Sequence, residues 1–337
     1  MKLLSGELQP LVEQLRSRVE LQFKRDIQLA ADAFGRSVQS RWFPHHTPIQ
    51  NGDDAAALPD GDGFVLFAAE GMRAEFVTAD PWFCGFCSVM VNLNDIAAMG
   101  GRPWAICDVL FLGSGDNQRL FEGMQAASEA FGVPIVGGHT SRVEGASFLA
   151  ASVVGRARRL ISGHAARPGQ VLLVATDLRG AFRGGGGNFN AATAAPPDRL
   201  RAQLAALPEL AERGLVTAGK DISMAGVCGS LLMLLETSGV GAHLNLAALP
   251  APNGVDAFRW LTAFPSFGFV LSVDEGAVTE VCARFQELGV SCAAVGRVTR
   301  ERRLEIGHGD ERALYWDLAQ PLTGFGPAPA TLAKRSA

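Results

Sequence analysis

The chain has 337 residues, of which 48% are hydrophobic and 19% are charged. This composition excludes a disordered polypeptide and suits one large or two medium-sized domains. The net charge of −4, without a long run of Lys or Arg, argues against a nucleic-acid-binding protein. The six scattered cysteines do not form a disulfide framework, and we find neither a signal-peptide core nor an apolar run of membrane-spanning length. We therefore predict a soluble, cytoplasmic protein that binds neither nucleic acid nor membrane.

The N-terminal segment, residues 1–40, is predicted to be helical. Apolar residues between Leu11 and Ala30 recur at three- and four-residue spacing with charges between them, which predicts one amphipathic helix over 8–37. An irregular stretch with two prolines and two histidines follows at 41–48.

From residue 63 onward, short apolar runs alternate with helical patterns. In the first domain, placed at 41–161, the predicted strands are 63–70, 104–112, 133–138 and 147–157, and the predicted helices are 87–100 and 117–131. A stretch rich in Gly and Pro at 162–170 predicts the domain boundary.

The second domain, placed at 166–320, repeats the mixture of strands and helices. Its predicted strands are 171–177, 268–274 and 291–299, and its predicted helices are 197–213, 222–239 and 276–288. Residues 321–337, rich in Pro and Ala, are predicted to be a mobile tail. The pattern as a whole predicts an α+β protein.

The first candidate motif for chemistry is the acidic pair Asp53-Asp54, which follows Gly52 in a loop before a strand. Carboxylate oxygens are hard ligands of the kind that Mg²⁺ takes alongside substrate phosphates. The same residues also suit a plain Asx-type turn, and the motif taken alone favours the turn.

The second motif lies on the predicted helix 87–100, where Asn92 and Asp95 are three residues apart and so share one face. The surrounding Val, Leu, Ile, Ala and Met residues would bury the rest of the helix. A buried carboxylate is costly unless it is paired or bound to a metal. The alternative is a carboxylate at the helix edge that is simply solvated.

The third motif, residues 135–142, is a strand that enters Gly137-Gly138 and continues into polar and basic residues. Glycine lets backbone N–H groups approach a phosphate, and Arg142 can bind phosphate oxygens through two N–H groups. A glycine pair alone is weak evidence, but here it follows a buried strand, where ligand-binding loops often begin.

These motifs resemble those of the superfamily of aminoimidazole ribonucleotide synthetase (PurM-like proteins). They occur in matching order and spacing as GDDAA, VNLNDIAAMGGRP, VGGHTSR and KDISMAG, at residues 52–56, 91–103, 136–142 and 220–226. The arrangement is most similar to thiamine-monophosphate kinase, whereas the GGHT run is similar to selenophosphate synthetase.

The resemblance implies a two-domain homodimer whose N-terminal halves build a shared β-barrel, with a C-terminal α/β sandwich. It implies an ATP-dependent enzyme with Mg²⁺ bound by acidic side chains. The implied metal ligands are Asp53, Asp54, Glu70, Asp95 and Asp221, of which Asp95 and Asp221 are also the implied catalytic residues. The implied nucleotide-binding residues are Gly52, Asn92, Gly137, Gly138, His139, Thr140 and Arg142.

The sequence departs from the kinase pattern at three positions. Glu70, His139 and Met224 stand where the kinase-like pattern has Asp. Two hypotheses therefore follow. The chain is an ATP- and Mg²⁺-dependent enzyme of phosphoryl transfer, ligation or dehydration on a small metabolite, or it is a nucleotide-binding relative without turnover that serves as a dimeric partner subunit.

Two further features have ordinary structural interpretations. Cys84 and Cys87 form a lone CxxC at the start of a helix, which buried small residues explain better than redox or zinc chemistry. The glycine run 184–187 beside Arg179 and Arg183 is either a cradle for the phosphate or carboxylate of a second substrate or a flexible surface loop.

Overall fold

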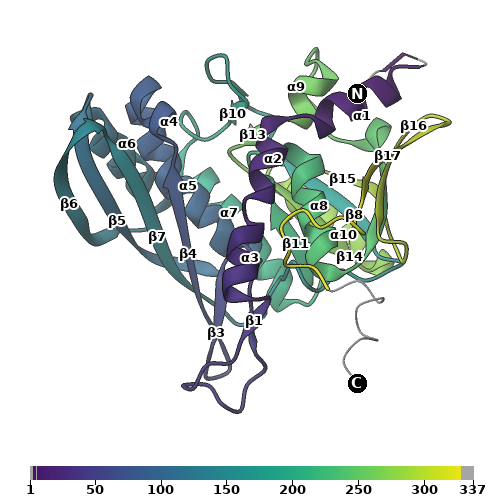
Figure 1. Cartoon of the computed structure of the whole chain (residues 1–337), viewed down its shortest axis with the longest axis horizontal. Coiled ribbons are helices and arrows are strands. Elements are labelled where there is room, and N and C mark those ends of the chain that lie inside the picture. Colours follow the sequence, from purple (N-terminus) through teal and green to yellow (C-terminus); the bar gives the residue numbers. More distant parts are fainter. Residues whose placement is uncertain (1–2, 5, 328–337) are drawn as a thin grey trace. The chain divides into compact units, whose positions relative to one another are not determined.

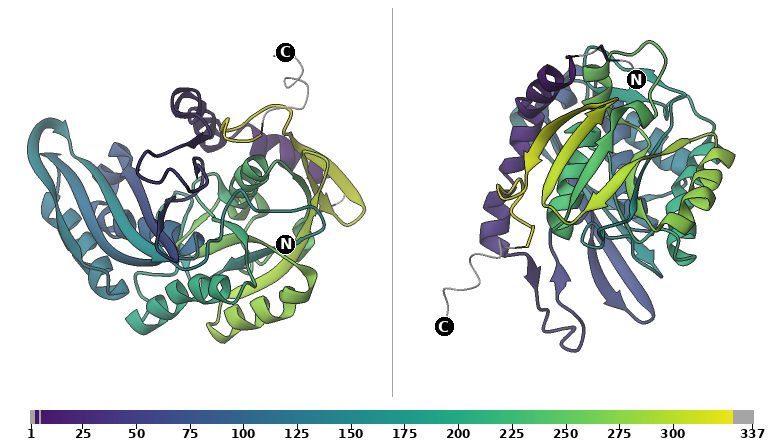
Figure 2. Two further views of the ribbon diagram at one scale, coloured as in Figure 1. Left: turned by 90° about the horizontal axis from the view of Figure 1, so that it is seen from below. Right: turned by 90° about the vertical axis from the view of Figure 1, so that its right-hand side faces the viewer.

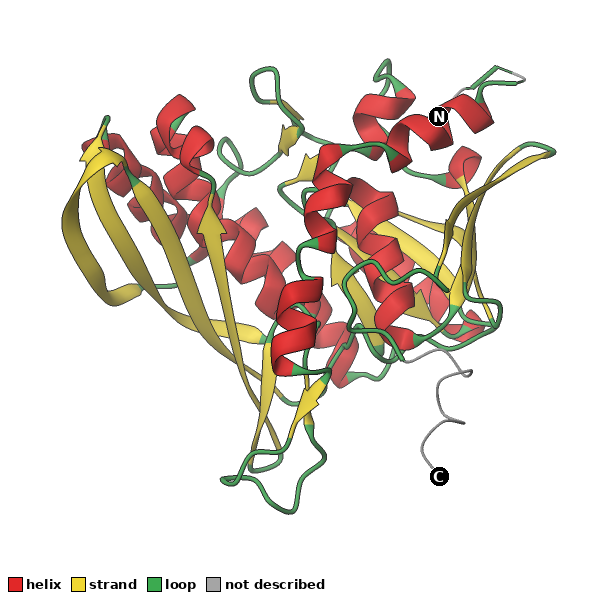
Figure 3. Cartoon of the chain, in the orientation of Figure 1, coloured by secondary structure: helices red, strands yellow, loops and turns green. Residues whose placement is uncertain are grey.

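The computed structural model of the protein describes residues 3–4 and 6–327. It divides into two compact units, and helices and strands are mixed in both (Figure 3). The five-strand unit consists of residues 54–160 and 191–213. The seven-strand unit takes the described parts of 1–53, 161–190 and 214–337.

The five-strand unit contains a sheet in the order β3-β4-β7-β5-β6, in which only β5 and β6 are parallel neighbours. Its strands are β3 (Ala56–Asp60), β4 (Gly63–Met72), β5 (Arg102–Ser114), β6 (Ile135–Ala146) and β7 (Phe148–Ala157). Its helices are α4 (Ala74–Ala79), α5 (Pro81–Ala98), α6 (Asn117–Phe131) and α7 (Pro197–Glu212).

Helix α5 is the centre of this unit, and every residue from Phe83 to Ala98 is buried. The helix begins earlier than predicted because Pro81 occupies its first turn and the Asp80 side chain accepts a hydrogen bond from the Phe83 backbone N–H. It packs on β4 and β7 and against α6 (Figure 1). The buried face of the sheet is therefore the face that α5 covers.

The two faces of the five-stranded sheet differ in character. Leu66, Leu110 and Leu149 point to the helix-covered face and are fully buried. On the other face, called here the open face, Phe67 and Phe148 remain about half exposed. Alternation along each strand places neighbouring residues on opposite faces, so each strand presents one set of side chains to the helices and one set to the open face.

The seven-strand unit contains a sheet in the order β11-β14-β8-β15-β12-β16-β17. Its strands are β8 (Val171–Thr176), β11 (Ala218–Asp221), β12 (Gly241–Asn245), β14 (Gly268–Val273), β15 (Ser291–Thr299), β16 (Arg303–His308) and β17 (Glu311–Asp317). The smaller strands are β1 (Ser37–Val38), β2 (Ile49–Gln50), β9 (Ala181–Phe182), β10 (Asn188–Asn190) and β13 (Phe264–Pro265). Its helices beyond the N-terminal segment are α8 (Gly226–Ser238), η1 (Leu246–Ala248), α9 (Ala257–Leu261), η2 (Glu275–Ala277) and α10 (Val278–Glu287).

The N-terminal segment forms three helices, so the prediction of a single helix over 8–37 was wrong. They are α1 (Leu8–Arg16), α2 (Val19–Arg25) and α3 (Gln28–Phe34). Arg18 has the extended backbone angles φ −62° and ψ 133°, which break the helical hydrogen-bond ladder although the apolar spacing continues. Figure 2 shows these purple helices beside the yellow C-terminal strands, and α1 packs on β17.

The chain beyond β17 is held by a buried carboxylate on α8. Glu236 is 1% exposed and accepts hydrogen bonds from the backbone N–H groups of Leu322, Thr323 and Gly324, and from the Thr323 hydroxyl. Leu322 is fully buried. This first part of the predicted mobile tail is therefore packed, because it supplies donors to a charge that would otherwise be costly to bury. Residues 328–337 of that tail lie outside the described residues.

Other predictions differ mainly in length. The spans 117–131 and 291–299 agree with α6 and β15, whereas the strand predicted at 133–138 continues to Ala146 as β6. It continues because its backbone remains paired in parallel with β5 through the polar residues. Within the described residues, the helices are all too short or too polar to cross a membrane.

Close packing of α5 on α6 gives a first testable prediction. A Cβ atom at Gly123 would lie 1.9 Å from the Trp82 carbonyl oxygen, so alanine there would force the two helices apart. We expect Gly123→Ala to lower the free energy of unfolding by about 1–3 kcal/mol, despite the better helix propensity of alanine. Urea denaturation measures this. Gly276→Ala is the control, because open space surrounds that position, and an equal loss in both variants would contradict the packing argument.

Candidate active site

Two of the predicted acidic residues converge within the five-strand unit. Asp54 precedes β3 and Asp95 lies on α5, and one carboxylate oxygen of each lies within 4.8 Å of the other. Asp95 is 6% exposed and Asp54 is half-buried. At that separation two negative charges repel each other by about 3 kcal/mol at an effective dielectric constant of about 20. A divalent cation between them would remove this repulsion.

Asn92 adds a third polar group to the same face of α5. It is fully buried, its amide nitrogen donates to the Ser88 carbonyl at 2.8 Å, and its Oδ1 has no hydrogen-bond partner among the described residues. A buried amide oxygen without a donor is uncommon, and such an oxygen is suited to bind a water molecule or a cation. Carboxylate and amide oxygens together form a donor set that suits Mg²⁺ or Ca²⁺ rather than a soft metal.

Asp53 is oriented differently from its neighbour. Its two carboxylate oxygens accept hydrogen bonds from the Ser162 hydroxyl at 2.6 Å and from the Gly163 backbone N–H at 2.9 Å. Asp53 therefore joins the acidic loop to the turn that precedes β8 within the seven-strand unit. Gly52 lies in the same unit and packs against Phe325.

Two acidic residues on neighbouring strands, Glu70 and Asp108, form an acidic row on the helix-covered face. The sequence motifs predicted a role for Glu70 but not for Asp108. Glu70 on β4 and Asp108 on β5 both pair with Ala151 of β7, so the two carboxylates flank Ala151 on one face. Burial raises the pKa of Asp108. Gly138 pairs with Asp108 on the other side and leaves room for its carboxylate, which would lie 2.6 Å from a Cβ at that position.

The residues of the glycine-pair motif lie on β6 and are divided between the two faces. Gly138, Thr140 and Arg142 belong to the helix-covered face, since they pair with Asp108, Leu110 and Leu112. Gly137 and His139 belong to the open face, where the His139 ring lies 5.9 Å from that of Phe111. Strand geometry thus places His139 on the face opposite to Thr140 and Arg142.

Asp221 ends β11 of the seven-strand unit and is 6% exposed. The strand is buried throughout and pairs with β14, where Asp221 lies opposite Phe269. Met224, which stands in place of an Asp of the kinase pattern, is 38% exposed on the turn that leads to α8.

The structure also shows where the Cys84 and Cys87 pair and the glycine run 184–187 lie. Cys84 and Cys87 are buried on α5, as predicted, and burial, reinforced by the charge of Asp80, raises the pKa of Cys84 to about 12. The glycine run is the tip of the β9–β10 hairpin. The guanidinium of Arg179 donates hydrogen bonds to both carboxylate oxygens of Asp177 and to the Leu288 carbonyl. Because these groups engage it, Arg179 is not positioned to bind a phosphate.

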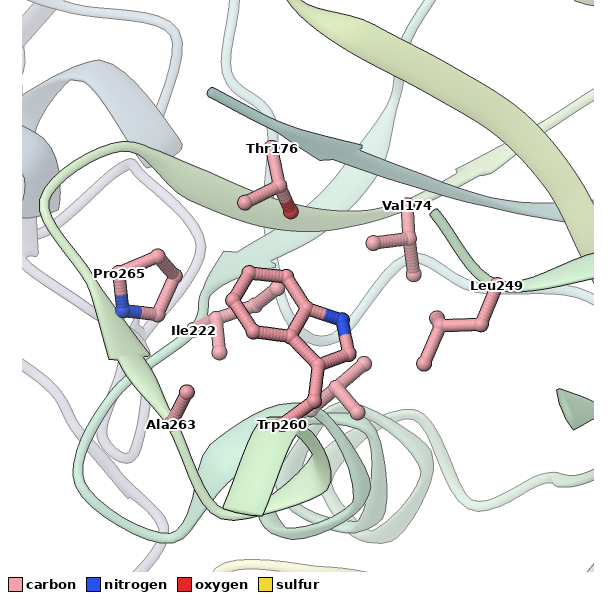
Figure 4. A pocket seen from close by; sticks show the side chains of 8 residues that line it. Val174, Thr176, Ile222, Leu249, Trp260, Ala263 and Pro265 are labelled. Carbon is pink, nitrogen blue, oxygen red and sulfur yellow. The ribbon is translucent and has the colours of Figure 1, made fainter. Parts of the chain in front are cut away.

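A narrow cavity in the seven-strand unit has a different chemical character (Figure 4). Its lining is apolar except for the hydroxyl of Thr176, and the Trp260 ring lies across it while its indole N–H donates to the Pro250 carbonyl. The cavity offers no charged group to a phosphate, so we exclude it as a phosphate site.

Comparison with known protein families supports the resemblance that the motifs indicated. Residues 52–157 match the model of the AIR synthase related protein N-terminal domain, and residues 167–309 match that of the C-terminal domain. The chain belongs to the AIR synthase related family. This confirms the predicted superfamily.

The proteins that are similar to this chain have different names. An uncharacterized protein of Synechocystis sp. is 44% identical over 321 residues, covering 94% of this chain and 98% of that protein. A thiamine-monophosphate kinase of Synechococcus elongatus is 29% identical over 291 residues, covering 77% and 87%. The structure of PurL of T. maritima complexed with ATP has a TM-score of 0.69 at 19% identity, covering 90% of this chain and 53% of that one. The chain thus spans about half the length of this PurL.

The hydrogen bonds of Asp53 give the second prediction. An Asn side chain would keep one acceptor and lose the charge, so Asp53→Asn should lower the free energy of unfolding by about 2 kcal/mol. Thermal or urea denaturation without nucleotide measures this. Asp32→Asn, an exposed change on α3, should alter stability by about 0.5 kcal/mol or less. No difference between the two variants would contradict the structural role.

Proposed function

We propose that the chain is an ATP- and Mg²⁺-dependent enzyme that transfers a phosphoryl group to a small metabolite, or uses ATP to drive its ligation or dehydration. The observation that carries this proposal is the convergence of Asp54 and Asp95 on a buried helix face. The names of two relatives, a thiamine-monophosphate kinase and a PurL complexed with ATP, support the same chemistry.

The donor set fits the metal. Asp54 and Asp95 would hold Mg²⁺, and the buried amide oxygen of Asn92 would support the same face of α5. When bound, Mg²⁺ would neutralise the charge that builds up on a transferring phosphoryl group.

The chain's own residues would orient the nucleotide. Burial of α5 fixes the side chains of Asn92 and Asp95, so their geometry is set before a ligand binds. Thr140 and Arg142, on the helix-covered face of β6, would donate hydrogen bonds to phosphate oxygens. Glu70 and Asp108, on the same face, would bind a second cation or accept a proton from the attacking group.

A homodimer is part of the proposal. The open face carries apolar side chains in contact range along neighbouring strands, with Phe111 and Phe148 paired and their rings 6.4 Å apart. An antiparallel sheet normally buries at least one face, and a second apolar face is a surface for association. A second copy placed on the open face would build the shared barrel that the family resemblance implies.

The third prediction tests the metal site. Asp95→Asn keeps the size of the side chain and removes its charge, so Mg²⁺–ATP affinity should fall by roughly tenfold or more. Isothermal titration calorimetry in Mg²⁺ measures this. Asp62→Asn is the matched control, because Asp62 lies in the turn between β3 and β4 and forms only an exposed pair with Arg156.

Equal affinity in the native chain and in Asp95→Asn would contradict the assignment of the site. Nucleotide binding without ADP release, across a panel of small-molecule acceptors, would instead favour the nucleotide-binding partner subunit. The replacements at Glu70, His139 and Met224 motivate that second function.

The fourth prediction tests the dimer. Val109 lies on the open face between Ala150 and His139 and is 38% exposed. Val109→Lys should convert the dimer to a monomer, because a buried unpaired ammonium group would be costly at the interface. Size-exclusion chromatography with light scattering measures the mass. Val38→Lys, an exposed valine on β1, should leave the dimer intact, and a native chain that is already monomeric would contradict the proposal.

A further inference from the structure

Two cysteines meet within the seven-strand unit. Cys282 lies on α10 and Cys292 lies on β15, and their Sγ atoms are 3.7 Å apart. The two elements are joined by a short turn through Gly289, so they are held together by local chain geometry as well as by packing. Both cysteines are half-buried.

The packing of α10 fixes which side of the helix faces the sheet. Val281 and Phe285 are fully buried, and the Phe285 ring packs against that of Phe267. Cys282 is next to Val281, at the margin of this buried side. The thiol therefore meets the neighbouring strand while remaining partly accessible to solvent.

The contact between the sulfur atoms makes the two thiols chemically unequal. Once Cys282 is ionised, a hydrogen bond from the Cys292 thiol stabilises the thiolate and lowers the pKa of Cys282 to about 7. The pKa of Cys292 is raised by the same hydrogen bond and by burial. By contrast, burial raises the pKa of Cys228 to about 12. A thiolate at neutral pH next to a second thiol is the arrangement that reacts with electrophilic oxygen.

We propose that Cys282 and Cys292 form an oxidisable dithiol, a modification site that hydroperoxides convert to an intrachain disulfide between α10 and β15. The Cys282 thiolate attacks a peroxide oxygen and breaks the O–O bond. With hydrogen peroxide, this step gives a sulfenic acid on Cys282 and, after protonation of the leaving hydroxide, one water.

The second step closes the disulfide. The Cys292 sulfur attacks the Cys282 sulfur, the S–O bond breaks, and the thiol proton leaves with the hydroxide as a second water. Two thiols are oxidised by two electrons in total, and the peroxide is reduced. The sulfur atoms must approach from 3.7 Å to the disulfide length of about 2.05 Å, a movement that side-chain rotation can supply.

The fifth prediction is tested on the full chain with hydrogen peroxide as the probe. Arg284 lies between the two cysteines, so trypsin separates them onto different peptides, and only a disulfide keeps these peptides joined. We expect a non-reduced digest of oxidised protein to contain this joined pair, and dithiothreitol to release it. Intact-mass measurement should show the loss of two hydrogen atoms.

Three variants resolve the steps. Cys292→Ser should stop at the sulfenic acid, which dimedone traps on Cys282. Cys282→Ser should leave Cys292 largely unmodified at neutral pH, because burial still raises the pKa of Cys292 after the hydrogen bond with Cys282 is lost. Cys107→Ser, which removes the exposed cysteine on β5, should leave the disulfide unchanged.

The pH dependence gives an independent test that needs no variant. A thiolate forms above its pKa, so alkylation of Cys282 by iodoacetamide should rise with a midpoint near pH 7 rather than the value of about 8.5 for a free cysteine. Failure to find the joined peptides at a peroxide concentration that oxidises reduced glutathione in the same buffer would overturn the proposal, as would a Cys282 midpoint at the free-thiol value.

Discussion

The candidate site depends on one constraint, which is that a carboxylate is buried on an otherwise apolar helix. Asp95 is 6% exposed on α5, and Asp54 approaches it from the loop before β3. Burying charge is unfavourable unless opposite charge or hydrogen-bond donors compensate for it, and two like charges increase the cost. Apolar packing of α5 supplies the stability that allows such an arrangement to persist. In this way the core of the five-strand unit holds the side chains of the proposed cation site in place before a ligand binds.

The sheet beneath α5 separates two tasks by its two faces. Leucines on the helix-covered face build the core, and Glu70 and Asp108 add acidic groups to the same face. The open face carries Val109 and Phe148 instead. Because side chains alternate along each strand, one short sequence such as residues 137–142 contributes to both faces. A single motif can therefore serve both the proposed nucleotide site and the proposed dimer contact.

The seven-strand unit relies on other polar contacts. Glu236 anchors the chain beyond β17, and Asp53 joins the acidic loop to the turn before β8. In both cases one carboxylate accepts hydrogen bonds from several backbone or hydroxyl donors. These bonds hold a segment in place that has no regular secondary structure. The proposed dithiol of Cys282 and Cys292 lies on α10 and β15 of the same unit, so its oxidation would act on a part of the fold that the acidic pair does not use.

The sequence by itself determined the family, the mixed helix and strand content, and the motifs that contain Asp54 and Asp95, because these depend on local periodicity and on characteristic residue spacing. It predicted α6 and β15 with correct bounds for the same reason. Tertiary structure alone decided which carboxylates meet, since the distance between Asp54 and Asp95 depends on how α5 packs and not on their separation in the chain. It also decided the face of His139, the row that includes Asp108, and the meeting of Cys282 with Cys292. Strand register and helix packing determine these three features, and neither can be predicted from a short stretch of sequence.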